Sequence, residues 1–158
     1  MQDHLCHKRA YILNAMYNDS RFAIYNYLYG LFYNVVTKNV YLVSEPQELT
    51  KADVEDGFIV LQVGNVVDES EFTREAYARV RCFVYAFIPT KSRGRVDDKK
   101  YGAFEESISA AVEAASKSGS GDYYIHEGST LSADGANFTN ADNVFYTYIK
   151  SFLVCIDK

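Results

Sequence analysis

Hydrophobic side chains alternate with larger or charged ones at every second position between residues 78 and 88. The small apolar positions are Ala78, Val80, Cys82, Val84, Ala86 and Ile88. A two-residue period places these side chains on one face of a β-strand. Pro89 follows, and its missing N–H group predicts the end of the strand ladder.

A different period begins after residue 97. Apolar side chains recur at three- and four-residue spacing, at Tyr101, Phe104, Ile108, Ala111, Val112 and Ala115. This spacing predicts an amphipathic helix with one buried stripe. Asp97 and Asp98 open it, where negative charge is favourable, and Lys117 closes it.

Weaker patterns predict the remaining elements. We expect a first short helix around Leu5–Met16, a short strand at Val40–Val43, a central strand at Phe58–Val67 after a turn at Glu55–Gly57, a short strand at Tyr123–His126 and a final strand at Val144–Ile156. On the final strand, Tyr148, Phe152 and Val154 share one face. The segment Glu127–Asn143 is rich in Gly, Ser, Thr, Asn and Asp without a period, so we expect an irregular loop.

The segment Phe22–Val36 fits two patterns. Ile24, Leu28, Leu31 and Val35 have helical spacing, whereas alternate tyrosines from Tyr25 to Tyr33 fit a strand. Its length favours a helix.

The element order predicts a single α+β domain over residues 1–158, with a mainly antiparallel sheet and helices packed on one face. A chain of 158 residues, 48% hydrophobic, can bury a sizeable core. We expect that core to include Val60, Leu61, Val80, Val84, Phe104, Ile108, Val112, Phe152 and Val154.

Charge and cysteine content narrow the possible partners. The formal net charge is −5, and the acidic excess lies after residue 100. Because phosphate neutralisation requires a positive face, we expect no binding to free nucleic acid. Cys6, Cys82 and Cys155 are odd in number and far apart, which predicts reduced thiols. No apolar run approaches the ~20 residues of a membrane span, and Met1–Arg9 is polar, so we expect a cytoplasmic protein without membrane contact.

Candidate catalytic and metal-binding residues form no recognisable motif. His4, Cys6 and His7 can each ligate a metal, but His126 is far away in sequence and the paired spacing of a zinc site is missing. Gly128-Ser129-Thr130 lacks the second glycine of a nucleophile elbow. Ser92–Arg95 lacks the lysine and spacing of a phosphate-binding loop. We therefore expect no catalytic residue, no metal and no cofactor.

Two charged runs flank the strand of residues 78–88. Basic side chains follow it at Lys91, Arg93, Arg95, Lys99 and Lys100, and acidic side chains precede it at Asp68, Glu69, Glu71 and Glu75. Such runs are either solvated loops or complementary surfaces through which copies pair head to tail. The 14 tyrosines are likewise typical of a core periphery or of an interface.

This order of elements resembles the tail terminator (tail completion) proteins of long-tailed bacteriophages and prophages. The resemblance is carried by the stretches Gly57–Gly64 and Arg79–Tyr85 and by the helix of residues 101–116. It implies a non-enzymatic subunit that forms a ring, typically a hexamer, at the head-proximal end of the tail tube. Its partners would be copies of itself and tail-tube and head-completion proteins within a virion or tail particle.

An alternative interpretation is a small-molecule-binding or enzymatic α+β domain. Its pocket would use the tyrosine-rich segment 22–33 and the loop 127–143. A concave pocket with converging polar groups would favour this alternative.

Overall fold

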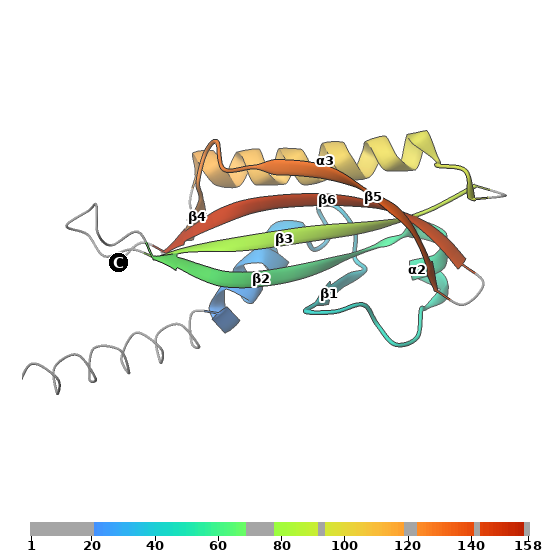
Figure 1. The fold of residues 1–158 in the computed structure, drawn as a ribbon, viewed down its shortest axis with the longest axis horizontal. Helices are drawn as coiled ribbons and strands as arrows, with labels where there is room; N and C mark the ends of the chain where they lie inside the picture. Colours follow the sequence, from blue (N-terminus) through green and yellow to red (C-terminus); the bar gives the residue numbers. More distant parts are fainter. Residues whose placement is uncertain (1–20, 69–77, 92–93, 119–122, 141–142, 157–158) are drawn as a thin grey trace, which may run out of the picture.

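The computed structural model describes residues 21–68, 78–91, 94–118, 123–140 and 143–156 (Figure 1). The elements in chain order are a helix over residues 21–32, β1 (Val40–Leu42), α2 (Lys51–Asp56), β2 (Phe58–Asp68), β3 (Ala78–Pro89), α3 (Asp98–Lys117), β4 (Tyr123–Ile125), β5 (Leu131–Asn140) and β6 (Asn143–Ile156). They form one α+β domain, as the sequence predicts. The tyrosine-rich segment is helical, which decides between its two patterns. The helix expected at Leu5–Met16 lies outside the described residues.

The strands form one mixed, mostly antiparallel sheet in the order β1-β2-β3-β6-β4, and β5 also pairs with β6. β1 is parallel to β2, whereas the other pairs are antiparallel. The β3–β6 ladder runs without a register shift from Ala78 opposite Ile156 to Pro89 opposite Phe145. Pro89 is the last residue of β3, as predicted.

The expectation of an irregular loop at Glu127–Asn143 is wrong. Residues 131–140 form β5, which pairs with the same edge of β6 as β4. β4 and β5 therefore act as one interrupted edge strand. Ser129 bridges the interruption, because its Oγ accepts a hydrogen bond from Leu153 N (3.0 Å) and donates one to His126 O (2.7 Å).

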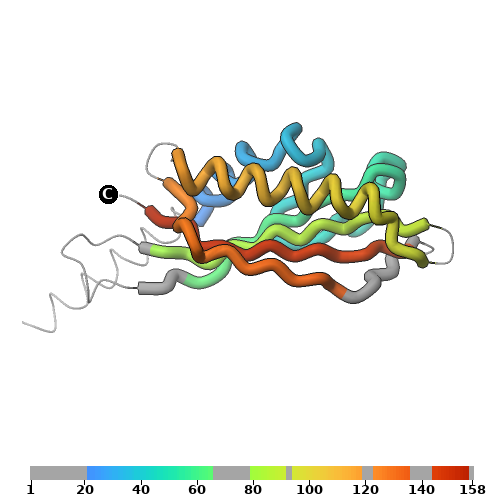
Figure 2. The backbone as a smooth tube through the Cα atoms, turned by 90° about the horizontal axis from the view of Figure 1, so that it is seen from above, coloured from blue at the N-terminus to red at the C-terminus, as the bar shows by residue number. Residues whose placement is uncertain are grey.

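One face of the sheet carries the main core. The helix of residues 21–32 and α3 both pack there, over the alternate residues of β3 (Figure 2). The buried set includes Ile24, Leu28, Phe32, Val80, Cys82, Val84, Ala86, Ile88, Phe104, Ile108, Val112, Tyr148, Phe152 and Val154. All nine residues predicted for the core are buried. Burial raises the pKa of the Cys82 thiol to about 12, which keeps it protonated.

A smaller cluster lies on the opposite face, at the end of the sheet near α2. It consists of Phe58, Val60, Phe87 and Phe145, with Tyr41, Leu49 and Tyr85 packed against it. Gly57 joins α2 to β2 with φ of +86°, and a Cβ there would lie 2.7 Å from Phe87 O. The chain can therefore turn into β2 only with glycine at this position.

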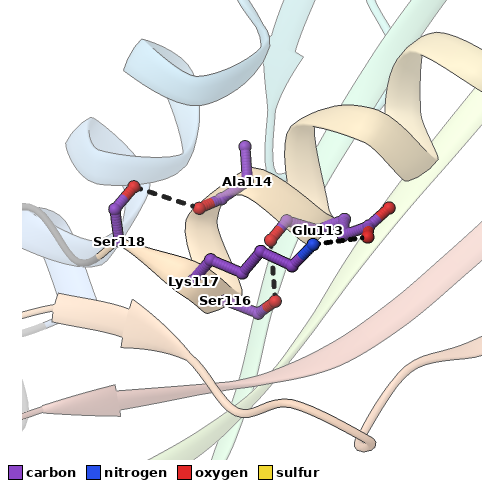
Figure 3. A network of polar contacts seen from close by, with 5 residues as sticks. All are labelled: Glu113, Ala114, Ser116, Lys117 and Ser118. Carbon is purple, nitrogen blue, oxygen red and sulfur yellow. Dashed lines mark hydrogen bonds and ion pairs between the residues drawn. The ribbon is translucent and has the colours of Figure 1, made fainter.

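Both ends of α3 are capped by the residues that flank it. At the N-terminus the Asp97 side chain accepts a hydrogen bond from Lys100 N (3.3 Å). At the C-terminus Lys117 Nζ pairs with Glu113 Oε1 (2.9 Å), and Ser118 Oγ donates to Ala114 O (3.2 Å), as Figure 3 shows. The bounds predicted from Asp97 and Lys117 are thus confirmed.

Replacing Phe104 by Ala should lower the free energy of unfolding by roughly 3–5 kcal/mol, because the ring is buried between α3 and the sheet. Phe22→Ala is the matched control, since this ring is 71% exposed and its loss should change stability by about 0.5 kcal/mol or less. Chemical denaturation of both variants tests this. Equal midpoints for Phe104→Ala and Phe22→Ala would contradict the packing.

Candidate assembly surfaces

The two charged runs belong to opposite ends of the sheet. The acidic run connects Asp68, the last residue of β2, to Ala78, the first residue of β3, and these two residues pair with each other. The basic run follows Pro89 at the far end of β3. A 12-residue strand is roughly 35–40 Å long, several times the ~10 Å screening length at 0.1 M salt. The two ends of β3 are therefore electrostatically independent within one chain.

At the basic end the chain makes a tight turn. Lys91 N donates to Arg95 O (2.7 Å), and Gly94 supplies φ of +72°. Lys91, Arg95, Lys99 and Lys100 are exposed, and Lys100 Nζ already donates to Glu55 O (2.7 Å) at the end of α2. The predicted contact residues Arg93, Glu69, Glu71 and Glu75 lie outside the described residues.

The helix of residues 21–32 has exposed aromatic side chains on a second side, with exposed Asn26 among them. Phe22, Tyr29 and Tyr33 follow the spacing i, i+7, i+11, so they form one stripe, and all three are exposed. The Tyr29 and Tyr33 rings stack with centroids 5.0 Å apart. Tyr27, on the other side of the helix, stacks on Tyr123 of β4. The stripe therefore points away from β4, toward the β1 edge.

Two exposed aliphatic side chains lie at the β1 edge. Leu42 ends β1, and Val43 follows it with 54% of its surface exposed. We call the set of Phe22, Tyr29, Tyr33, Leu42 and Val43 the helix flank.

Val43 also has a strained backbone, with φ of +76°. This region is unfavourable for a β-branched residue by about 1–3 kcal/mol. Three hydrogen bonds hold it. Val43 N donates to Leu61 O (2.9 Å), Ser44 N donates to Leu42 O (2.9 Å), and Gln62 Nε2 donates to Val43 O (3.0 Å).

The face of the sheet opposite the two long helices carries a second apolar surface. Phe83 and Tyr85 of β3 stack with centroids 6.0 Å apart, next to Ile149 and Leu153 of β6. These four side chains are half-buried, and Leu131 of β5, on the same face, is 65% exposed. We call these five residues the open sheet face. Arg81 lies in the same row and donates to Ser129 O (3.3 Å).

A polar cluster joins α3 to the β5–β6 ladder. The Tyr101 hydroxyl donates to the Asp134 carboxylate, while Lys150 Nζ donates to Ser132 Oγ (3.1 Å), which lies 3.2 Å from the Tyr148 hydroxyl. Burial, followed by the bond to Asp134, raises the pKa of Tyr101. These contacts fasten β5 to α3 and β6.

A buried carboxylate stabilises α2. Asp53 is fully buried, and its carboxylate accepts hydrogen bonds from the Tyr41 hydroxyl (2.6 Å) and Thr50 N (3.0 Å) in a capping box. Desolvation and the bond to Asp53 raise the pKa of Tyr41 to about 12. The pattern Thr50-x-x-Asp53 ahead of Gly57 is the sequence signal for α2, a helix that is absent from the predicted elements.

One segment of the alternative pocket, the helix of residues 21–32, reaches from β2, where Val63 N donates to the Tyr25 hydroxyl (3.1 Å), to β4, where Tyr27 stacks on Tyr123. The other segment follows β4 in the chain, and its strand β5 pairs with the same edge of β6. The predicted ligands His4, Cys6 and His7 lie outside the described residues. Within the described ranges, no group of three or more His, Cys, Asp or Glu side chains is placed to hold a metal ion.

Comparison with known proteins identifies no family for this chain. No protein-family model matches this chain, and no curated protein has a significantly similar sequence. In the part of the chain that the structure describes, no helix combines the length and apolarity needed to cross a membrane.

Replacing Val43 by Asn should raise the free energy of unfolding by about 1 kcal/mol, because Asn adopts the left-handed region at lower cost. Val35→Asn is the matched control, since Val35 is 61% exposed and has no positive φ, and it should change stability by no more than ~0.5 kcal/mol. Thermal and urea unfolding measure both. A Val43→Asn protein that is less stable than Val35→Asn would show that the backbone is not strained.

Proposed function

We propose that this protein is a non-enzymatic structural subunit that assembles head to tail with copies of itself. The proposed assembly is a ring at the head-proximal end of a phage or prophage tail tube. The observation that carries the proposal is that the acidic run precedes β3 in the chain and the basic run follows it, so that they are joined to opposite ends of this strand. Charges held this far apart gain little from each other within a chain but attract those of a neighbour.

Head-to-tail contacts are heterologous, and they close into a ring when the rotation between neighbours permits. The resemblance of the element order to tail terminator proteins supports such a ring. The exposed aromatic and aliphatic side chains of the helix flank also support assembly, because monomers seldom expose large contiguous apolar patches.

Replacing Arg93 and Arg95 by Glu should weaken self-association and co-sedimentation with purified tail tubes, because it turns attraction at the basic end into repulsion. Added salt should weaken wild-type association as well. Adding Glu69→Lys and Glu71→Lys in the same chain should recover part of the loss. Sedimentation velocity and tube co-sedimentation report both effects, and melting temperatures show that the monomer is folded.

The control is Lys117→Glu at the other end of α3 from the basic run, matched with Arg95→Glu alone for an equal change in net charge. It should assemble like the wild type. Equal assembly of the control and the Arg93/Arg95 variant would eliminate the charged contact. Failure of the wild-type chain to join purified tail tubes would overturn the proposed function.

A further inference from the structure

Among the described residues, the helix flank and the open sheet face are two partly exposed apolar surfaces of different shape. The helix flank is a ridge of aromatic and aliphatic side chains along the helix of residues 21–32 and the β1 edge. The open sheet face is a broad layer of half-buried side chains on β3 and β6, with exposed Leu131 on β5. A helix packed on a sheet is one of the few stable ways to cover such a layer.

We propose that the helix flank of one copy packs on the open sheet face of the next copy. This docking contact rests on the proposed function, because it supplies an apolar contact for the same head-to-tail assembly. The two surfaces cannot meet within one chain, because the helix of residues 21–32 lies on the opposite side of the sheet from Phe83 and Tyr85. A second copy is therefore the occupant that already carries the matching surface.

The composition of both surfaces fits a protein–protein contact. The open sheet face contains Phe, Tyr, Ile and Leu with Arg81 in the same row, and the helix flank contains Phe, Tyr, Leu and Val. Neither defined set contains Lys, Asp or Glu, the residues depleted in interface cores, whereas aromatic residues and Arg are enriched there. Binding a polynucleotide requires several positive charges along its phosphates. Arg81 is one charge and already donates to Ser129 O, so this face fits a protein partner better than a nucleic acid.

The size of the helix flank is adequate for such a contact. Its five side chains expose 37–71% of their surface, with Tyr29 the least and Phe22 the most exposed. That corresponds to roughly 400–500 Å² of side-chain surface, about half of the ~800 Å² that each partner buries in a standard interface. The backbone of the β1 edge and the polar rim would supply the remainder.

Because the two surfaces differ, the docking contact is heterologous. A chain altered on one surface keeps the other surface intact. Two chains altered on different surfaces can therefore form one contact between them and no more.

The experiment uses two full-length variants, one per surface. The first carries Tyr29→Glu and Tyr33→Glu on the helix flank, and the second carries Phe83→Glu on the open sheet face. Leu131→Glu is a milder alternative to the second, because Leu131 is exposed and its replacement leaves the core intact. The control carries Ala103→Glu and Ala110→Glu on the exposed side of α3.

Native mass spectrometry and sedimentation velocity should show each surface variant self-associating at least tenfold more weakly than the wild type. A mixture of the two should form one-to-one pairs and nothing larger. The control should assemble like the wild type. The mixture should still form pairs at about 0.5 M salt, where the charged ends are screened, because the docking contact is apolar.

Three results would overturn the docking contact. Dimers of the open-sheet-face variant alone would indicate a two-fold contact between helix flanks instead. Surface variants that assemble like the control would remove the contact while leaving the charged-end assembly and the proposed function in place. A wild-type chain that stays monomeric at about 1 mM would also overturn it, whereas the proposed function would still be judged by binding to tail tubes.

Discussion

The antiparallel pairing of β3 with β6 is the contact on which the rest of the structure depends. Its register is continuous from Ala78 opposite Ile156 to Pro89 opposite Phe145, so both strands keep a fixed set of side chains on each face. On its other edge β3 pairs with β2, and on its other edge β6 pairs with β4 and β5. A slip of one residue in this ladder would expose Val80 and Val84 and bury Arg79 and Arg81. The same register separates the helix-covered face from the open sheet face.

The elements that depend on this ladder could be predicted from the sequence. β3 and α3 have strict periods because each buries one face, and burial is what places apolar residues at regular spacing. Phe104, Ile108 and Val112 are buried for that reason, and the Asp97 cap and Lys117 set the ends of α3. The helix over residues 21–32 was harder to predict, because apolar side chains occur on its flank as well as on its buried side.

The sequence did not reveal the features whose conformation depends on contacts with distant parts of the chain. β5 is an edge strand with polar, exposed positions and a register shift near Gly135, where a Cβ would lie 2.6 Å from Thr147 Cβ. Its strand conformation comes from pairing with β6, since Gly, Asn and Asp have low β-propensity. The positive φ of Val43 is imposed by hydrogen bonds to β2, which no local pattern indicates. Alternation did place Phe83 and Tyr85 together, but it could not show that the second face of the sheet is only partly covered.

We infer that a rigid sheet presents different surfaces to different neighbours: charged runs at its two ends, the helix flank along one edge and an aromatic layer on one face. Copies that contact each other through two different surfaces form rings by repeated rotation, whereas two-fold dimers use the same surface on both copies. Electron microscopy of the wild-type chain, alone at high concentration and bound to purified tail tubes, tests that claim most directly. We predict closed rings in which every copy is related to the next by the same rotation. Two-fold dimers, or tail tubes whose ends carry no added ring, would contradict it.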